Sequence, residues 1–399
     1  EPEGDGTYAG RLANQTRMRS YNGINLGPKE VVLDNAGYPA YCSCHVRDPK
    51  VWKQGGCWHM LLGARAQGDQ GCILLYKSPD GLSWRLEGSA TNLGRQPFGY
   101  MWECPNLATL GGREFLFVCP QGVGKRPTSL QNIHNSGYIA LDGRLIDLMA
   151  KDPGLMDADG PYPCIDEAGF VELDFGFDFY APQVFEDERG RTILVGWASL
   201  PDIETQYDNP TREWTHTLTL PRELSLNEGG RVCQWPVAEI DALRGELVEF
   251  TGDVAGFTGT VGSSSYDVFD LTGAMGAHFA GTADICVTQI ESRDAVLRLN
   301  DDLELSIIGN LCELAFTSPA GAYRSVRRLP LSALTAGRIR DLRVIVDTSI
   351  VEIYVNGGEV TMTTRWYPES VDELRVSSSL KGRHQGWEMG SCHFAGIDS

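Results

Sequence analysis

The sequence predicts an all-β protein in which a β-propeller is followed by a β-sandwich. Over some 220 residues, apolar runs of four to six residues recur, and each ends at Gly, Pro, Asp or Asn, which is typical of short strands and turns. Helical periodicity is scarce throughout the chain. Beyond about residue 250 the runs alternate between apolar and polar residues, as they do in the strands of a sandwich.

The first part of the chain predicts the propeller. Regularly spaced short strands indicate a sandwich, a barrel or a propeller. Residues 77–84 favour a propeller, because a strand, an Asp-Gly turn and an anchoring Trp often join the outer strands of a blade. Residues 20–25 are a fainter copy of this unit. The clearest apolar runs are residues 58–62, 72–76, 115–118 and 192–195.

A short helix is expected between the two domains. Residues 235–244 carry Pro at an early position and apolar residues at helical spacing. We therefore predict a propeller over residues 1–230, a helical linker over residues 231–250 and a sandwich over residues 251–399.

The sandwich is predicted most clearly by one hairpin. Residues 342–347 and 351–355 alternate in polarity, residues 356–358 read Asn-Gly-Gly, and residues 359–364 alternate again. This pattern predicts antiparallel strands joined by a tight turn, with one face exposed to water.

Composition restricts the class of partner. The chain has 399 residues, a formal net charge of -19 and a pI near 4.8. Phosphates would be repelled, so nucleic acids and anionic membranes are not expected as partners. No run of about 18 uncharged apolar residues predicts a membrane span. A small neutral molecule or an oligosaccharide fits this charge, whereas a phosphorylated substrate needs a local basic pocket.

The eleven cysteines predict neither a metal site nor a cofactor site. They form no Cys-x-x-Cys pair and no Cys/His cluster with zinc-ligand spacing. Several lie inside apolar runs, and an odd number of such thiols indicates a reducing compartment, so we expect the cytoplasm. The chain begins at Glu1 without an initiator Met or a recognisable signal peptide.

The first candidate site lies in residues 46–52. Arg47 stands beside Asp48, and Pro49 fixes the turn, so the carboxylate can be held ionised and directed at a ligand. The alternative is a surface Arg–Asp pair in a turn, which these residues alone favour.

The second candidate site lies in residues 101–107. Glu103 is flanked by Trp102, Cys104 and Pro105, and apolar neighbours disfavour a charged carboxyl, which suits a general acid. Trp102 also offers a stacking face for a sugar ring. An exposed glutamate at a strand end is an equally good interpretation.

The third candidate site lies in residues 173–183, where aromatic residues interleave with carboxylates. Asp178 and Tyr180 are its candidate ligand contacts. Such mixtures occur in sugar sites but also in ordinary blade cores, and without other information the core is the better interpretation.

Together the three segments resemble a known family. Arg-Asp-Pro, Glu-Cys-Pro and Asp-Phe-Tyr-Ala-Pro-Gln, in this order, resemble the motifs of glycoside hydrolase family 32, which includes invertases, sucrose-6-phosphate hydrolases, inulinases and levanases. Gly196-Trp197, residues 218–224 and residues 351–357 also agree with the family. The resemblance covers almost the entire chain.

The resemblance implies a fold and a mechanism. The fold would be a five-bladed β-propeller followed by a β-sandwich, and the mechanism would retain configuration at terminal β-fructofuranosyl linkages of sucrose, fructo-oligosaccharides or fructans. Glu103 would be the general acid/base. Asp48, held by Arg47, would bind fructose hydroxyls and stabilise the transition state. Asp178 and Tyr180 would line the rim of the pocket.

The chain departs from the family at two points. The family nucleophile is the Asp of an Asn-Asp-Pro-Asn-Gly motif, which this sequence lacks; Asp208-Asn209-Pro210 is the nearest approximation and lies far downstream. Residues 1–40 correspond to later strands of the second blade, so the N-terminal part of the propeller is expected to be incomplete. Asn106 stands where the family usually has Asp, which removes a charge beside Glu103.

Three explanations of the missing motif remain open. The chain is a fragment whose nucleophile and missing strands come from a second chain, or it is a carbohydrate-binding propeller without catalysis, or another acid such as Asp5 replaces the nucleophile. The related arabinan- and xylan-cleaving propellers are a further alternative, against which Glu-Cys-Pro and the sandwich hairpin argue.

Overall fold

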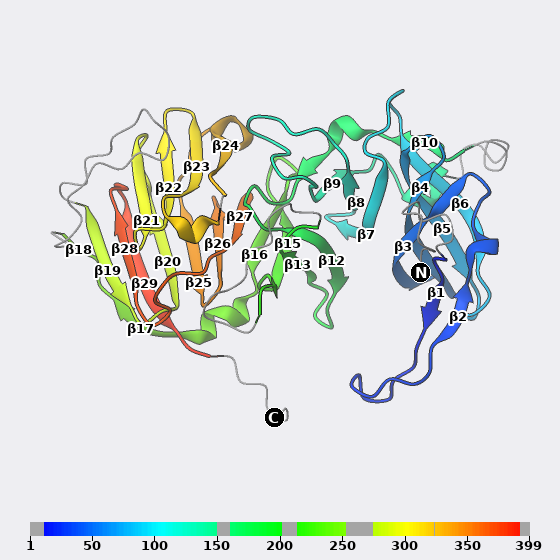
Figure 1. The fold of residues 1–399 in the computed structure, drawn as a ribbon, viewed down its shortest axis with the longest axis horizontal. Helices are drawn as coiled ribbons and strands as arrows, with labels where there is room; N and C mark the ends of the chain where they lie inside the picture. Colours follow the sequence, from blue (N-terminus) through cyan, green and yellow to red (C-terminus); the bar gives the residue numbers. More distant parts are fainter. Residues whose placement is uncertain (1–11, 150–159, 202–213, 253–273, 323, 392–399) are drawn as a thin grey trace. The chain divides into compact units, whose positions relative to one another are not determined.

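The computed structural model describes residues 12–149, 160–201, 214–252, 274–322 and 324–391 (Figure 1). These residues form twenty-nine strands, five 3-10 helices and one α-helix, α1 (Leu145–Met149). The predicted all-β fold class is therefore confirmed. Within the described part of the chain, no helix has the length and the apolar character needed to cross a membrane.

The chain divides into two compact units. Unit 1 comprises residues 1–124, 133–172 and 181–184, and unit 2 comprises residues 125–132, 173–180 and 185–399. Residues of the predicted propeller thus occur in both units, whereas all residues of the predicted linker and sandwich lie in unit 2. The predicted domain boundaries at residues 230 and 250 stay predictions.

Unit 1 contains three sheets. A two-stranded sheet pairs β1 (Gln15–Arg17) with β2 (Glu30–Leu33). A five-stranded sheet has the order β10-β6-β5-β4-β3, and a four-stranded sheet has the order β11-β9-β8-β7. The strands of these two sheets are β3 (Cys42–Gln54), β4 (Cys57–Ala66), β5 (Gln70–Ser78), β6 (Arg85–Asn92), β7 (Met101–Leu110), β8 (Arg113–Gln121), β9 (Gly137–Ala140), β10 (Tyr162–Ile165) and β11 (Val171–Glu172). Unit 1 also holds residues 181–184 of β12 (Tyr180–Glu186).

Apolar runs supply the core of unit 1. Leu61 of β4 and Ile73 of β5 pack in one cluster with Trp102 of β7 and Leu116 of β8. These strands belong to different sheets, so the two larger sheets bury apolar residues against each other. This packing places the edge strands β3 and β7 next to one another.

The predicted turn repeat is present in the structure. In residues 77–84 the hydroxyl of Ser78 accepts a hydrogen bond from the backbone N–H of Gly81 at 2.8 Å, and Ser20 accepts one from Gly23 at the same distance. Both glycines have a positive φ, which costs little without a Cβ. The two segments therefore share one turn design, and residues 77–84 join the neighbouring strands β5 and β6 as expected.

Unit 2 contains a smaller antiparallel group followed by the sandwich. The smaller group includes β13 (Thr192–Ala198), β14 (Thr217–Leu218), β15 (Arg222–Leu226) and β16 (Val232–Pro236). One sandwich sheet has the order β17-β29-β20-β25-β26-β27, and the other has the order β18-β19-β28-β21-β22-β23-β24. Their strands are β17 (Arg244–Val248), β18 (Thr251–Gly252), β19 (Met275–Phe279), β20 (Ala283–Thr288), β21 (Ala295–Leu299), β22 (Leu303–Ile308), β23 (Leu311–Phe316), β24 (Val326–Pro330), β25 (Leu342–Asp347), β26 (Ile350–Val355), β27 (Val360–Arg365), β28 (Leu374–Ser378) and β29 (Arg383–Met389).

The sandwich encloses one apolar core. Ile285 and Val344 of the six-stranded sheet are buried in the same cluster as Leu297, Leu305 and Leu314 of the seven-stranded sheet. Alternate side chains of each strand point to one face, so each sheet directs a row of apolar residues inward.

The predicted hairpin is confirmed, but the prediction that one of its faces is exposed to water is wrong. β25, β26 and β27 pair antiparallel in sequence order. Their polar side chains are nevertheless buried: Arg343, Glu352, Thr363 and Arg365 are each at most 2 % exposed. The polar face carries ion pairs instead of water. The Arg222 guanidinium, for example, lies 2.6 Å from the Glu352 carboxylate.

The predicted helix is shorter than expected and begins later. Trp235 and Pro236 end strand β16, where Trp235 is paired with Glu223 of β15. A 3-10 helix follows over Ala238–Leu243. Backbone pairing with β15 overrides the helical spacing of the first residues, which is a common outcome for a weak amphipathic signal.

Candidate active site

The first two motifs lie at bulges on neighbouring edge strands. The register of β3 shifts between Arg47 and Lys50, and the register of β7 shifts between Glu103 and Asn106. Each bulge contains a proline, which cannot donate a backbone hydrogen bond to the ladder. The sequence therefore interrupts both strands where the candidate acids stand.

The residue before each motif proline is left-handed. Asp48 has a φ of 62°, Cys104 a φ of 47° and Ala181 a φ of 48°, and each of them precedes a proline. This conformation is unfavourable for residues other than glycine and costs on the order of 1–3 kcal/mol at each position. Backbone strain of this kind is concentrated at functional sites, and here it re-aims the side chains on either side of each proline.

Arg47 binds Glu103 directly. Its Nε and Nη2 donate to Glu103 Oε1 at 2.8 and 2.6 Å, and its Nη1 lies 3.1 Å from His45 Nδ1. The two side chains are 25 % and 13 % exposed, so the pair is shielded but not sealed from solvent. The sequence led us to expect Arg47 to hold Asp48. The structure differs because Arg47 reaches across to β7.

Asp48 is held by the backbone of β7. Its Oδ2 accepts hydrogen bonds from the Cys104 N–H at 3.0 Å and from the Cys104 thiol at 3.7 Å. Burial raises the pKa of Asp48, and the nearby Glu103 charge raises it further, although the Cys104 N–H and Arg47 act in the opposite direction. Asp48 and Glu103 therefore lie close together, because Asp48 is hydrogen-bonded to Cys104, the residue that follows Glu103.

Asn106 connects the site to β12. Its Nδ2 donates to the carbonyl oxygens of Cys104 and Pro182, both at 3.0 Å, and its Oδ1 accepts from the Val184 N–H at 3.1 Å. Asn106 is fully buried. An ionised aspartate could not donate to these carbonyls, so the amide suits this position. Lys50 also donates to the Val184 carbonyl, and burial lowers the pKa of Lys50.

Trp102 does not present a stacking face. It is fully buried among the apolar residues between the two larger sheets of unit 1. Its indole N–H donates to the Phe98 carbonyl at 2.7 Å. In this structure Trp102 thus supports the strand that carries Glu103, because alternation along β7 turns its ring to the core side.

Asp178 and Tyr180 belong to unit 2 and are buried. Arg365 donates to Asp178 Oδ1 through Nε and Nη2 at 3.1 and 3.0 Å, and Arg324 donates to Asp178 Oδ2 at 2.6 Å. Asp178 therefore lies in a charge cluster with two arginines. A role of Asp178 and Tyr180 at the rim of a sugar pocket stays a prediction.

Three residues of the site were not predicted from the sequence. His45, Lys50 and Cys104 each contact a candidate residue or its neighbouring strand. The alternation of β3 gives a signal for His45, which stands two residues before Arg47 and on the same face. Among the described residues, no group of three or more His, Cys, Asp or Glu side chains is placed to hold a metal ion.

The arrangement joins two carboxyl groups, a guanidinium and hydrogen-bond donors in one partly shielded place. Such a set can exchange a proton with a bound group and bind hydroxyls. Asp208, Asn209 and Pro210, like Asp5, lie outside the described residues.

Comparisons with known proteins agree with these motifs. The family model described as "Glycosyl hydrolases family 32 N-terminal domain" matches residues 11–236, and the one described as "Glycosyl hydrolases family 32 C terminal" matches residues 314–388. The chain is 33 % identical to the sucrose-6-phosphate hydrolase of Staphylococcus xylosus, with 90 % of this chain and 67 % of the relative covered. It is 32 % identical to the enzyme of the same name from Bacillus subtilis, with 95 % and 74 % covered.

Solved structures show the same fold. The sucrose-6-phosphate hydrolase of Lactobacillus gasseri has a TM-score of 0.71 and 25 % identity, and the match covers 95 % of this chain and 73 % of that protein. This similarity confirms the predicted propeller-and-sandwich class. The chain spans about two thirds to three quarters of the length of the relatives named here. The matching profiles, the identities and the fold together show that the chain belongs to glycosyl hydrolase family 32.

Proposed function

We propose that the chain is part of a β-fructofuranosidase-type glycosidase that cleaves terminal fructosyl linkages of sucrose, fructo-oligosaccharides or fructans. The observation that carries this proposal is the convergence of Asp48 and Glu103 through Arg47 and Cys104. The names of the relatives, sucrose-6-phosphate hydrolases, support a sucrose-like substrate.

The proposed reaction retains configuration. Glu103 gives its proton to the glycosidic oxygen as the bond from the fructosyl carbon to that oxygen breaks. A nucleophilic carboxylate then bonds to the fructosyl carbon. In the second step the Glu103 carboxylate takes a proton from water, which attacks the same carbon and releases the nucleophile.

Arg47 and Asp48 would assist this chemistry without bonding covalently to the sugar. Arg47 fixes the position of the Glu103 carboxyl through two hydrogen bonds. Asp48 would accept hydrogen bonds from fructose hydroxyls, and its carboxylate would stabilise the positive charge that develops in the transition state.

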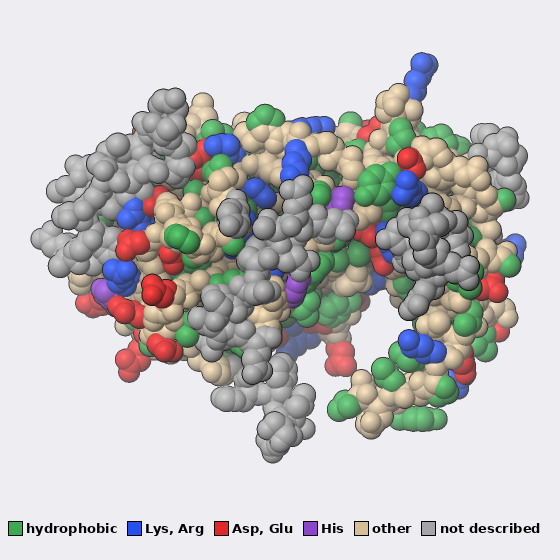
Figure 2. Space-filling model, in the orientation of Figure 1, with side chains coloured by type: hydrophobic (Ala, Val, Ile, Leu, Met, Phe, Trp, Pro, Cys, Tyr) green, Lys and Arg blue, Asp and Glu red, His purple; other side chains and the backbone are tan. Residues whose placement is uncertain are grey.

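The nucleophile would be supplied by a polypeptide segment that carries the Asn-Asp-Pro-Asn-Gly motif, which these 399 residues lack. β1 and β2 form a sheet of only two strands within the described residues, whereas the other sheets of unit 1 have four or five. Large hydrophobic side chains are also exposed in residues 12–31, and green atoms stand among tan and blue ones on the protruding hairpin in Figure 2. The six exposed hydrophobic residues are Leu12, Met18, Tyr21, Ile24, Leu26 and Val31. The edge of a two-stranded sheet can accept a further strand, and exposed apolar side chains next to the sheet favour a segment that covers them.

No disulfide joins any of the ten cysteines in the described residues. This supports a reducing compartment such as the cytoplasm as the place of action.

The substitution Glu103→Gln separates an enzyme from a binding protein. In the presence of the complementing polypeptide, we expect it to reduce fructose release from sucrose by about 10²- to 10⁴-fold, because the proton donor is lost. Sucrose affinity, measured by calorimetry, should change little, since the amide keeps the shape of the carboxyl. Unchanged turnover would contradict the proposed role of Glu103, and absence of turnover in every combination would favour the binding protein.

A further inference from the structure

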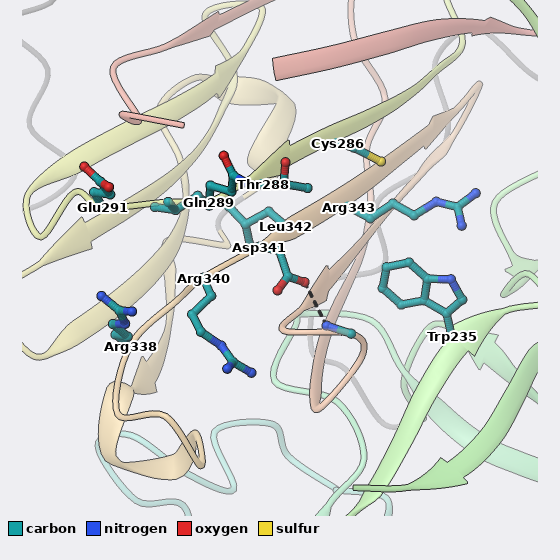
Figure 3. A pocket seen from close by; sticks show the side chains of 12 residues that line it. Trp235, Cys286, Thr288, Gln289, Glu291, Arg338, Arg340, Asp341, Leu342 and Arg343 are labelled. Atoms are coloured by element: carbon teal, nitrogen blue, oxygen red, sulfur yellow. Dashed lines mark hydrogen bonds between the residues drawn. The ribbon is translucent and has the colours of Figure 1, made fainter. Parts of the chain in front are cut away.

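A cavity of about 860 Å³ lies in unit 2, apart from the residues of the candidate active site (Figure 3). It forms where the end of β20 meets residues 338–341 and Trp235 at the end of β16. Its size falls within the range of about 300–1,000 Å³ that is usual for small-molecule sites. The candidate acids Asp48 and Glu103 belong to unit 1.

The wall of the cavity is held by the Asn356 side chain. Asn356 is 8 % exposed; its Oδ1 accepts from the Arg340 N–H at 2.8 Å, and its Nδ2 donates to the Arg338 carbonyl at 2.9 Å. The Ile290 N–H donates to the Arg340 carbonyl at 2.8 Å. The backbone that carries both arginines is therefore fixed before any ligand arrives, which reduces the entropy lost on binding.

The guanidinium groups of Arg338 and Arg340 are available to a ligand. Both residues are exposed, and neither guanidinium has a hydrogen bond or an ion pair to another residue in the described part of the chain. Arg343, in the same lining, differs: its Nη2 lies 2.7 Å from Asp284 and 2.5 Å from Asp241. In Figure 3, Arg338 and Arg340 lie on one side of the cavity, and Arg343 lies on the other with Trp235.

Trp235 supplies an apolar surface with a polar edge. It is partly exposed, with the Arg343 guanidinium 5.4 Å from its ring centroid and the Tyr354 ring edge-on at 5.7 Å. Within the described residues its indole N–H has no acceptor. An indole that is fixed by its neighbours and still faces a cavity can pack against the C–H face of a sugar ring and donate to a hydroxyl.

The charges of the lining suit a neutral ligand. The Asp341 and Glu291 carboxylates accompany the two arginines, and Asp341 also accepts from the Gly357 N–H at 2.9 Å. An anion would be attracted by the guanidiniums but repelled by the carboxylates. Sugar hydroxyls can accept hydrogen bonds from the guanidiniums and donate hydrogen bonds to the carboxylates, so both kinds of group find partners.

We propose that this cavity is a second carbohydrate site, which binds neutral oligosaccharide chains independently of the candidate active site. Arg338, Arg340 and Asp341 bind hydroxyls, and Trp235 packs against a ring. The identity of the sugar as an oligofructoside rests on the proposed function; the site itself rests on the cavity and its lining.

The test uses a variant in which the candidate active site is disabled, Asp48→Ala with Glu103→Gln. Binding of 1-kestose is measured by calorimetry, and binding of inulin by electrophoresis in gels that contain it. We expect binding to persist in this variant and to weaken by at least about tenfold when Arg338→Ala and Arg340→Ala are added. These exposed side chains have no described partner, so the fold should be unaffected. Trp235→Ala should have a similar effect.

Trp387→Ala is the matched control, because Trp387 is also partly exposed in unit 2 and has an arginine, Arg244, 4.1 Å from its ring centroid. It should leave binding unchanged. The proposal is overturned if the arginine variants bind as tightly as their parent, if inorganic phosphate binds more tightly than the sugars, or if the disabled variant binds no oligofructoside. The last result would not contradict the proposed function, since turnover by the unmodified chain with its complementing polypeptide tests the candidate active site separately.

Discussion

At the scale of single residues, each of the three motifs contains an unusual backbone conformation. Asp48, Cys104 and Ala181 are all left-handed, and each precedes a proline. The sequence predicted Asp48 and Glu103 as neighbours from their motifs. It could not predict that Arg47 pairs with Glu103, because that choice depends on the bulge in β3, and a bulge leaves no unambiguous sequence signal.

Asp48→Asn should stabilise the chain at neutral pH. Burial and the charge of Glu103 raise the pKa of Asp48, so the folded state binds its proton more tightly than the unfolded state does. Stability from the protonated form is present at acidic pH and is lost as the pH rises through the folded pKa. The variant should therefore have the higher urea midpoint at pH 7, and the difference should shrink at pH 4.

Asp69→Asn is the control for this measurement. Asp69 is also left-handed, with a φ of 58°, but its side chain is 70 % exposed. Tryptophan fluorescence in urea at both pH values gives the midpoints. Equal effects of the two substitutions at pH 7 would show that burial of Asp48 has no energetic consequence.

At the scale of elements, one buried amide joins two strands. Asn106 of β7 satisfies the Pro182 carbonyl and the Val184 N–H of β12, as well as the Cys104 carbonyl within its own strand. The sequence identified Asn106 as a departure from the family but predicted an electrostatic effect on Glu103. Its bonds to the strands became visible only in the structure, because the partner lies more than seventy residues away.

Asn106→Ala should destabilise unit 1 by about 2–4 kcal/mol, because three buried backbone groups lose their partner. Asn106→Asp should also destabilise it at pH 7, since an ionised carboxylate cannot donate to the two carbonyls, and part of the loss should be recovered at acidic pH. Urea unfolding measures both effects. Asn310→Ala, at an exposed side chain, should change stability by less than about 0.5 kcal/mol; an equal effect of the two alanine substitutions would contradict this account.

At the scale of the whole molecule, buried charges join distant parts of the chain. Arg222 lies 2.6 Å from Glu352 and 3.4 Å from Asp174, and all three residues are in unit 2. Strand positions and the hairpin were predictable from periodicity. Burial of the polar face was not, because alternation cannot distinguish a face covered by water from one covered by ion pairs.

Arg222→Met should lower the free energy of unfolding of unit 2 by about 3–5 kcal/mol, since two buried carboxylates lose their cation. Arg375→Met removes a more exposed pair, with Asp301 at 3.1 Å, and should cost no more than about 1 kcal/mol. Thermal unfolding followed by circular dichroism compares the two variants. A loss for Arg222→Met no greater than that for Arg375→Met would show that the buried network contributes little.

The central claim is that Asp48 and Glu103 form one part of a fructoside-cleaving site. Its most direct test is the rate of fructose release from sucrose by the chain alone, by the chain with a family polypeptide that carries Asn-Asp-Pro-Asn-Gly, and by the Glu103→Gln variant with the same polypeptide. We predict turnover in the second mixture and a rate near background in the first and third. Full activity of the chain alone, or equal rates in the second and third mixtures, would contradict the account.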